Sequence, residues 1–303
     1  MPEPVFEPLG GRITDYGRDE LRLELSARGV ELPAREKAAK ALLVGFSETD
    51  AGVTLCTRLA LSCPEKILAG ATVAMYVYGI RDCVLCVPKS AYRAATALSA
   101  ASAGRDLFSV TLISDKYPLY DPRLLVSAVF GSEISPLKPL EKSSYAVLTP
   151  EKCVLIFEAL VKGLPAGKYF SVEGRVHALV RSSHDAKLGD AVGIPGGMTV
   201  TAGGAIKGYR ISPDDPVGGI DGIIIDRKYR GPEEKATFGC DRCGLCDRAC
   251  PIRLRPSEGV TRGGRIELGE TCIGCRVCDA VCPSGIKLCD AVMSAGKEDG
   301  HAG

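Results

Sequence analysis

A cysteine motif that occurs twice near the C-terminal end constrains this chain more than any other feature. Both copies have the spacing C-x2-C-x2-C-x3-C-P, and they begin at Cys240 and Cys272. Three thiolates at positions i, i+3 and i+6 allow a short loop to wrap around three irons of one cubane. The fourth cysteine of each copy cannot fold back onto the same cubane, so we expect it to cross to the other one. The duplicated motif therefore predicts two [4Fe–4S] clusters.

This is the spacing of bacterial two-cluster ferredoxins, and it assigns the ligands in two crossed sets. The first predicted set is Cys240, Cys243, Cys246 and Cys282, and the second is Cys272, Cys275, Cys278 and Cys250. Gly244 and Gly274 have no side chain, so backbone N–H groups there can approach the sulfur atoms. Two neighbouring clusters indicate one-electron transport, without indicating what donates or accepts the electrons.

Two other roles for these cysteines fit less well. Structural zinc takes four ligands, usually from two C-x2-C pairs, whereas a third and a fourth cysteine recur in both copies. Disulfides would indicate an oxidising compartment. The first residues, MPEPVFEPLGGR, lack the basic and apolar regions of a secretory signal. Fourteen cysteines in such a chain favour a reducing cytoplasm.

Length and composition exclude few functions. With 303 residues, of which 46% are hydrophobic and 25% charged, the chain has the composition of a globular protein of two or three domains. The net charge is +1, tryptophan is absent and no basic patch contains interleaved aromatic residues, so nucleic-acid binding has no support. The longest uncharged apolar stretch, Ile67–Ile80, has 14 residues and is too short for a transmembrane segment.

Apolar runs alternate with helical patterns through the first half of the chain. Residues 40–46, 83–87 and 108–113 have the composition of buried strands, and the segments between them have helical length. Strands that alternate with helices are typical of a parallel sheet. We therefore expect an α/β parallel-sheet domain over residues 1–164.

The pattern changes after this first domain. Residues 169–180 alternate between apolar and polar, as a half-buried strand does, and 199–201 and 219–225 have the composition of further strands. We expect a small, mainly β module over residues 165–232. The cysteine motifs then fall in a third domain, residues 233–303, for which the spacing predicts a ferredoxin-like α domain with two clusters.

Residues 105–290 resemble the RnfC family. The stretch Asp115–Pro118 (DKYP) is similar to the family's K-Y-P-x-G element, and residues 202–208 (AGGAIKG) are similar to its G-G-P-M-M-G element. Residues 172–174 (VEG) match the start of the family's β-grasp module, and the double cysteine motif closes the match. RnfC proteins are soluble electron-input subunits of membrane-bound ferredoxin:NAD⁺ complexes. They are related to the corrin reductase PduS and to the flavin subunit of complex I.

The resemblance has implications for fold, partners and location. It implies that the module over residues 165–232 is a β-grasp domain of the soluble-ligand-binding (SLBB) type. It also implies a redox partner protein: a ferredoxin, a flavoprotein, a corrinoid protein or a subunit of a membrane complex. The implied location is the cytoplasm or the periphery of a membrane complex.

Members of this family bind FMN through a Gly-rich loop and a later N-x-x-E-x-E-P element. Residues 45–51 (GFSETDA) occupy the place of the second element and retain two acids, Glu48 and Asp50. The glycines before residue 40 lack the spacing of a phosphate-binding loop. We therefore expect a shortened N-terminal region with a degenerate or absent flavin loop, and FMN binding that is weakened or lost.

If a flavin is retained, the resemblance implies that it contacts Glu48, Asp50, Lys116 and Tyr117. The alternative is that Glu48 and Asp50 lie in a solvated loop after a strand, because loop carboxylates are usually exposed.

The cysteines outside the double motif are expected to be packing residues. Cys83 and Cys86 have the spacing of a redox dithiol. They lie in an apolar run, however, and residues three apart on a strand point to opposite faces. Cys289 follows the second motif by only a few residues and could lie near it, although a packing role is favoured there too.

The sequence thus predicts an iron–sulfur electron-transfer protein that passes single electrons through two [4Fe–4S] clusters to or from a redox partner. One alternative is an FMN-containing NAD(P)H or corrinoid reductase of the RnfC/PduS type. Another is a reductive activation factor for a different metalloenzyme. The chain is an oxidoreductase-type subunit in each case, and the sequence assigns no catalytic residue.

Overall fold

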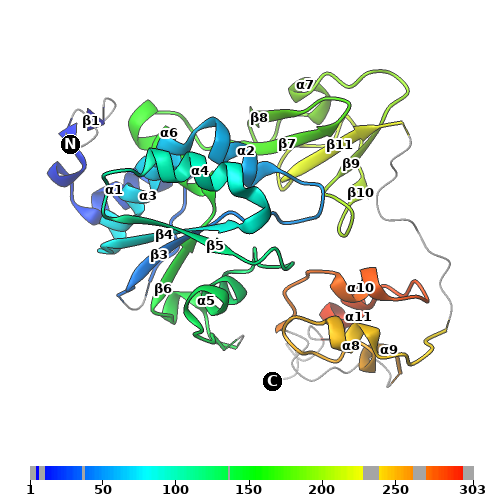
Figure 1. The fold of residues 1–303 in the computed structure, drawn as a ribbon. Helices are drawn as coiled ribbons and strands as arrows, with labels where there is room; N and C mark the ends of the chain where they lie inside the picture. The colour runs from blue at the N-terminus through cyan, green and yellow to red at the C-terminus, as the bar shows by residue number, and fades with distance from the viewer. Residues whose placement is uncertain are drawn as a thin grey trace, which may run out of the picture.

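The computed structural model describes residues 5–6, 11–35, 38–135, 137–227, 239–261 and 271–295. They form a parallel sheet with its helices, a mixed second sheet, and a small helical unit that carries the cysteine motifs (Figure 1). In this view the helical unit lies below the second sheet and beside the lower part of the α/β domain. Among the described residues, no helix combines the length and the hydropathy needed to cross a membrane.

Four strands form the parallel sheet, in the order β5-β4-β3-β6. They are β3 (Ala41–Gly45), β4 (Asp82–Pro88), β5 (Phe108–Ile113) and β6 (Tyr145–Leu148). All neighbouring strands pair in parallel, so the predicted α/β parallel sheet is confirmed. The strand order reverses between β3 and β6, and α/β proteins commonly bind ligands at the carboxyl ends of strands that flank such a reversal.

Helices cover both faces of this sheet. They are α1 (Arg18–Ala27), α2 (Leu55–Ser62), α3 (Pro64–Tyr78), α4 (Tyr92–Ala101), α5 (Pro122–Phe130) and α6 (Pro150–Lys162). Leu42 of β3 faces a large core formed with α1, α2, α3, α4 and α6, whereas its neighbour Leu43 faces a smaller core formed with α5. Cys83 and Cys86 are buried in different cores, so their side chains lie on opposite faces as predicted.

Side-chain caps fix the starts of two helices. Thr149 Oγ1 accepts a hydrogen bond from the Lys152 N–H at 3.1 Å, and Pro150 is the first residue of α6. This is the predicted N-cap with proline in the first turn. Asp121 caps α5 in the same way, accepting from the Arg123 N–H at 2.9 Å. Short elements complete the domain: the antiparallel pair β1 (Val5–Phe6) and β2 (Gly11–Arg12), and 3-10 helices at Ile13–Asp15, Lys89–Ala91 and Leu140–Lys142.

The second sheet has five strands in the order β10-β9-β11-β7-β8. They are β7 (Lys168–Gly174), β8 (Ala178–Ser182), β9 (Thr199–Ala202), β10 (Tyr209–Arg210) and β11 (Gly222–Asp226), with the short helix α7 (Leu188–Ala191). Only the pair of β7 and β11 is parallel among these strands. A small β module was expected here, and the mixed sheet agrees with that expectation.

The strand predicted over residues 169–180 is in fact two strands. The chain turns at Gly174, where φ is +102°, and β8 returns antiparallel to β7. The alternating sequence pattern did not predict this turn, because β7 is buried on both faces up to its last residue. Phe170 packs in the core of the second sheet, whereas Tyr169 packs in the core of the α/β domain.

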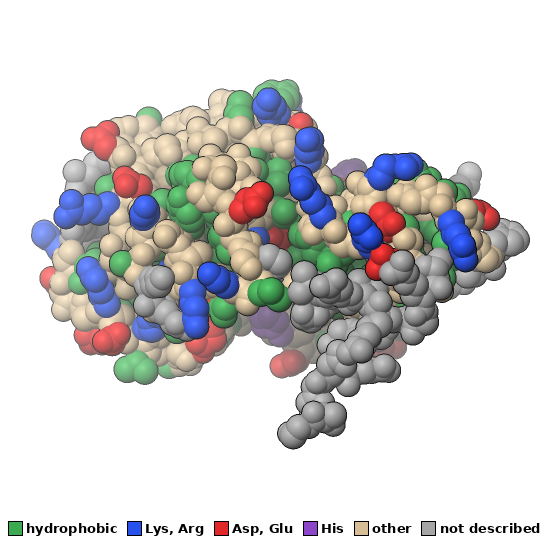
Figure 2. All heavy atoms as spheres, turned by 90° about the horizontal axis from the view of Figure 1, so that it is seen from below, with side chains coloured by type: hydrophobic (Ala, Val, Ile, Leu, Met, Phe, Trp, Pro, Cys, Tyr) green, Lys and Arg blue, Asp and Glu red, His purple; other side chains and the backbone are tan. Residues whose placement is uncertain are grey.

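The cysteine-rich unit consists of short helices joined by loops. They are α8 (Leu245–Ala249), α9 (Glu258–Thr261), α10 (Val277–Val281) and α11 (Leu288–Ala295). The domain boundary predicted at residues 232–233 lies outside the described residues. Figure 2 shows Lys and Arg side chains interspersed with Asp and Glu on the face seen from below, in keeping with the net charge of +1.

The close packing of α3 against α6 generates a prediction about Gly70. A Cβ atom at this position would lie 1.8 Å from the carbonyl oxygen of Cys153, so the two helices would have to separate. An exposed helical glycine gains stability on change to alanine. We expect Gly70→Ala to lower the free energy of unfolding instead, by about 1–3 kcal/mol or more, as overpacking does.

Urea unfolding of the purified protein measures this effect. Gly193→Ala is the matched control, because a Cβ there meets nothing within 4 Å. A Gly70→Ala protein as stable as the control variant would contradict the packing described for these helices.

Candidate functional site

The two copies of the cysteine motif fold alike, with an offset of 32 residues between Cys240 and Cys272. Left-handed backbone occurs at equivalent positions in both copies. The φ angles are 53° at Arg242, 68° at Gly244 and 58° at Arg253, and 63°, 58° and 69° at Gly274, Arg276 and Gly285. The duplicated sequence therefore has a duplicated backbone.

Left-handed residues flank the second cysteine of each copy. Around Cys243 they are Arg242 and Gly244, and around Cys275 they are Gly274 and Arg276. Successive right- and left-handed residues turn backbone N–H groups toward a common point and form a concavity that suits an anion. Such N–H groups are one means of setting the potential of a cluster. Each of these left-handed positions is a glycine in one copy and an arginine in the other, so the conformation does not depend on glycine.

The structure brings the four cysteines of each predicted set around one cavity. Cys240, Cys243, Cys246 and Cys282 line the first cavity, and Cys250, Cys272, Cys275 and Cys278 line the second. The segment after the fourth cysteine crosses with it. The first cavity is lined by Pro283, Ser284, Ile286 and Leu288, and the second by Pro251, Ile252, Leu254 and Pro256. Each cavity is therefore closed by the other copy of the motif.

The donor set and its surroundings fit a cubane. Four thiols are soft ligands of the kind that iron–sulfur clusters use. Apart from the cysteines, the second cavity is lined largely by apolar side chains, among them Ile252, Leu254 and Val292. Within the described ranges, no three His, Cys, Asp or Glu side chains converge as they would around a single ion. A cubane does not require such convergence, because each thiolate binds a different iron.

The two cavities differ at one pair of equivalent cysteines. Cys243 of the first cavity is exposed, whereas its equivalent in the second, Cys275, is buried. The next pair, Cys246 and Cys278, is buried in both cavities. The Tyr117 hydroxyl donates a hydrogen bond to the carbonyl oxygen of Cys275 at 3.0 Å. This bond connects the second cavity to the loop that follows β5 in the α/β domain.

Asp50 is buried between the two sheets, with 3% of its surface exposed. Its carboxylate accepts hydrogen bonds from the backbone N–H groups of Gly204 at 2.7 Å, Ile206 at 3.0 Å and Lys207 at 2.8 Å. A Cβ on Gly204 would lie 1.9 Å from the Ala51 carbonyl oxygen, so the two loops touch. Asp50 therefore does not lie in a solvated loop, because it joins the loop after β3 to the loop after β9.

Glu48 also accepts hydrogen bonds from the backbone. Its carboxylate receives the N–H groups of Cys56 at 3.0 Å and Thr57 at 2.9 Å, in the first turn of α2. Removal from water is the largest influence on this carboxyl and raises its pKa to about 7. Both acids of the predicted flavin element thus have backbone donors within the protein.

Among the described contacts, neither Lys116 nor Tyr117 forms a hydrogen bond with the Glu48 or Asp50 carboxylate. Lys116 is exposed. The Tyr117 hydroxyl reaches the Thr49 carbonyl oxygen at 3.4 Å as well as Cys275, so it lies beside the loop of Glu48 and Asp50 without bonding to either acid. Of the four predicted flavin residues, Glu48 and Asp50 lie in this loop and Tyr117 lies beside it, whereas Lys116 is exposed.

Two further residues at this junction were missed from the sequence. Lys207 Nζ lies 2.6 Å from the Tyr120 hydroxyl and 4.1 Å from the centre of its ring, and the Tyr120 ring lies 5.6 Å from that of Tyr117. Burial is the main influence that lowers the pKa of Lys207. Tyr120 follows the DKYP stretch by two residues and Lys207 lies within residues 202–208, so the family-like elements were the available signal. Their meeting depends on the fold.

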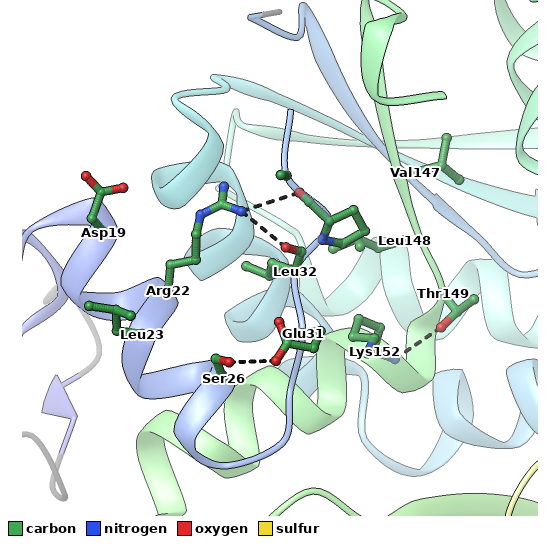
Figure 3. A pocket seen from close by; sticks show the side chains of 12 residues that line it. Asp19, Arg22, Leu23, Ser26, Glu31, Leu32, Val147, Leu148, Thr149 and Lys152 are labelled. Atoms are coloured by element: carbon green, nitrogen blue, oxygen red, sulfur yellow. Dashed lines mark hydrogen bonds between the residues drawn. The ribbon is translucent and has the colours of Figure 1, made fainter. Parts of the chain in front are cut away.

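A groove of about 900 Å³ lies at the edge of the parallel sheet, where β6 ends (Figure 3). Its walls are α1, the segment after it, the end of β6 and the start of α6. The lining residues are Asp19, Arg22, Leu23, Ser26, Glu31, Leu32, Pro33, Ala34, Val147, Leu148, Thr149 and Lys152. In Figure 3 the Arg22 guanidinium is turned to the chain at Leu32, whose carbonyl it reaches at 3.1 Å. None of the four predicted flavin residues lines this groove.

Comparison with known proteins identifies relatives of most of the chain. Residues 28–154 match the family of the Nuo51 FMN-binding domain. The chain is 25% identical over 242 residues to the C subunit of the proton-translocating ferredoxin:NAD(+) oxidoreductase complex of Clostridium ljungdahlii, in a match that covers 74% of this chain and 51% of that protein. It is also 25% identical over 235 residues to the C subunit of the Na(+)-translocating ferredoxin:NAD(+) oxidoreductase complex of Acetobacterium woodii, covering 73% and 52%.

The fold has a counterpart among solved structures. A chain of the NAD+-reducing [NiFe]-hydrogenase in the air-oxidized state matches with a TM-score of 0.60 and 16% identity, over 90% of this chain and 54% of that one. The H2-reduced state matches with a TM-score of 0.56 and 15% identity, over 87% and 52%. At this identity the likeness concerns the fold alone.

Both of these C subunits are longer than this chain, which spans about half the length of each. The predicted resemblance is confirmed: the chain is a distant relative of the RnfC-like C subunits of ion-translocating oxidoreductases, and it contains a region similar to the Nuo51 FMN-binding domain.

Proposed function

We propose that this protein is an electron-transfer subunit that carries single electrons through two [4Fe–4S] clusters to or from a redox partner. The observation that supports this most is the pair of cysteine-lined cavities, each completed by a cysteine of the other motif. When bound, the clusters would supply two one-electron centres close together. Cys240, Cys243, Cys246 and Cys282 would hold the first, and Cys250, Cys272, Cys275 and Cys278 the second.

The protein's own groups would control how these centres behave. Ile252 and Leu254 help to keep water from the second cavity, and the left-handed residues on either side of Cys275 orient backbone N–H groups there. Both low solvent exposure and hydrogen bonds to sulfur shift cluster potentials. In the first cavity the cysteine equivalent to Cys275 is Cys243, which is exposed.

The contact between Tyr117 and Cys275 supports an order for the two centres. It holds the loop of the second cavity at the junction of the α/β domain and the second sheet. The exposed Cys243 lies in the other cavity. We therefore assign the second cluster to the internal position and the first cluster to the position that faces a partner.

Relatives named as subunits of ion-translocating complexes support the choice of partner. We propose that the partner is another subunit of such a complex, with a ferredoxin, a flavoprotein or a corrinoid protein as alternatives. The protein would then work in the cytoplasm, at the periphery of that complex. The five-stranded module would be a β-grasp domain, and its parallel β7–β11 pair within an otherwise antiparallel sheet supports this. It would contribute to docking of the partner.

An FMN-containing NAD(P)H or corrinoid reductase of the RnfC/PduS type is the second candidate. The match of residues 28–154 to the Nuo51 FMN-binding domain favours it. Ser47 Oγ, two residues after β3 at the reversal of strand order, is buried and has no hydrogen-bond partner among the described residues. Against this candidate, the Glu48 and Asp50 carboxylates already accept backbone N–H groups. The third function, reductive activation of another metalloenzyme, stays a prediction.

The ratio of flavin to iron distinguishes the two candidates. Protein purified without oxygen should contain about eight irons and eight sulfides per chain, because two cubanes account for all of the metal. We expect no bound flavin. One FMN per chain would instead favour the reductase, and fewer than about four irons would contradict the cluster assignment.

The crossing of the ligands predicts the effect of Cys282→Ala. This cysteine ends the second motif in sequence but lines the first cavity with Cys240. The variant should lose the signal of the first cluster and keep that of the second, as measured by EPR of the reduced protein. Cys63→Ala, outside both cavities, is the control and should keep both signals. Loss of the second signal would overturn the crossed assignment.

The raised pKa of Glu48 predicts a pH dependence of stability. Because its pKa is about 7 in the folded protein and about 4.3 in an unfolded chain, the folded state keeps a proton that the unfolded state has released between these values. The contribution of Glu48 to stability should therefore be fully present below about pH 4.3, and it should be lost as the pH rises through about 7.

Urea midpoints between pH 5 and pH 8 measure this effect. Glu48→Gln keeps an acceptor oxygen but cannot ionise, so its midpoint should fall less over this range than that of the wild type. Glu133→Gln, at an exposed position, is the control and should follow the wild type. Parallel curves for wild type and Glu48→Gln would show that Glu48 does not carry the dependence.

A further inference from the structure

Five cysteines, not four, line the second cavity. The fifth is Cys289, near the start of α11, with 1% of its surface exposed. Its side chain belongs to one buried cluster with those of Cys272 and Cys278. A cubane has four irons, and each takes one protein thiolate. If the cavity holds the cluster of the proposed function, one thiol is therefore in excess.

The first cavity has a serine at the equivalent position. Asp247, which follows the third cysteine of the first motif, accepts the backbone N–H of Ser257 at 3.0 Å. Asp279, which follows the third cysteine of the second motif, accepts the backbone N–H of Cys289 at 2.7 Å. Ser257 lines the first cavity as Cys289 lines the second. The same backbone bond therefore presents a hydroxyl to one cavity and a thiol to the other.

Charged contacts hold Cys289 at this place. Arg276 forms salt bridges with Asp279 of α10 at 3.0 Å and with Asp290 of α11 at 2.6 Å. It therefore connects the two helices next to Cys289. The Cys289 sulfur also lies 3.9 Å from that of Met293, one turn further along α11. The thiol is thus kept beside Cys272 and Cys278, on the inner face of its helix.

We propose that Cys289 is a reserve iron ligand of the second cluster, able to take the place of Cys272 or Cys278. In the exchange the Cys289 thiol loses its proton and its sulfur forms a bond to the iron that the other cysteine held. The displaced thiolate takes up a proton, and no electron is transferred. The first cluster, with Ser257 in the equivalent position, has no such reserve.

Equivalent substitutions in the two motifs test the proposal. Intact clusters are counted by EPR spin quantitation and by iron and sulfide analysis of anaerobically purified protein, without any assay of activity. We expect about two intact clusters in the wild type and in Cys289→Ser, and about one in Cys240→Ala. We expect Cys272→Ala, the equivalent change in the second motif, to keep about two, and the double variant Cys272→Ala/Cys289→Ser to keep about one.

A gain-of-function variant complements these losses, because poor folding cannot produce the gain of a cluster. Ser257→Cys would place a fifth thiol at the first cavity. Added to Cys240→Ala, it should restore the first cluster, so that about two intact clusters are counted again.

Three results would overturn the reserve role. Cys272→Ala could lose its cluster as completely as Cys240→Ala does. Cys289→Ser alone could lose the second cluster, which would make Cys289 a permanent ligand. Wild-type protein without clusters would overturn the proposed function as well, and this outcome is distinguishable because it appears before any substitution is made.

Discussion

The crossing of the two cysteine motifs is the constraint on which the C-terminal unit depends. Each cavity takes three cysteines from one motif and the fourth from the other, together with the segment that follows it. Neither motif encloses a cavity by itself. Among the described residues of this unit few hydrophobic side chains are buried, and most of them are cysteines beside Leu254, Leu288 and Val292. Small domains of this kind usually need metal or disulfides to fold. Under the proposed function, thiolate–iron bonds would replace a large apolar core.

The two acids of the loop after β3 have structural roles. Asp50 accepts three N–H groups from the loop after β9, and Glu48 accepts two from the start of α2. The bonds of Asp50 fix the second sheet against the α/β domain. A flavin that needed the same carboxylates would have to compete with these donors. The resemblance to an FMN-binding domain and a structural use of its acids therefore coexist in one chain.

Much of the fold could be predicted from local patterns. The apolar runs at 40–46, 83–87 and 108–113 predicted the parallel strands, and Thr149 predicted a helix start, because both depend on near neighbours in sequence. The turn at Gly174 was missed because the residue types of β7 alternate whereas their burial does not. The solvated-loop interpretation failed for Asp50 because its donors lie in the loop after β9, far along the chain. The meeting of Tyr117, Tyr120 and Lys207 was hidden for the same reason. The grouping of the motif cysteines around two cavities agrees with the crossing that their spacing implies, and their binding of iron stays a prediction.

The hydrogen bonds of the Tyr117 hydroxyl determine which substitutions this junction tolerates during evolution. Both of its acceptors, at Thr49 and Cys275, are main-chain carbonyl oxygens. Substitution of the Thr49 side chain leaves its acceptor in place, because the carbonyl belongs to the backbone. The connection between the α/β domain and the second cavity is therefore insensitive to most changes on the receiving side. It rests on a single phenol group, and among relatives that keep this junction the tyrosine should vary least.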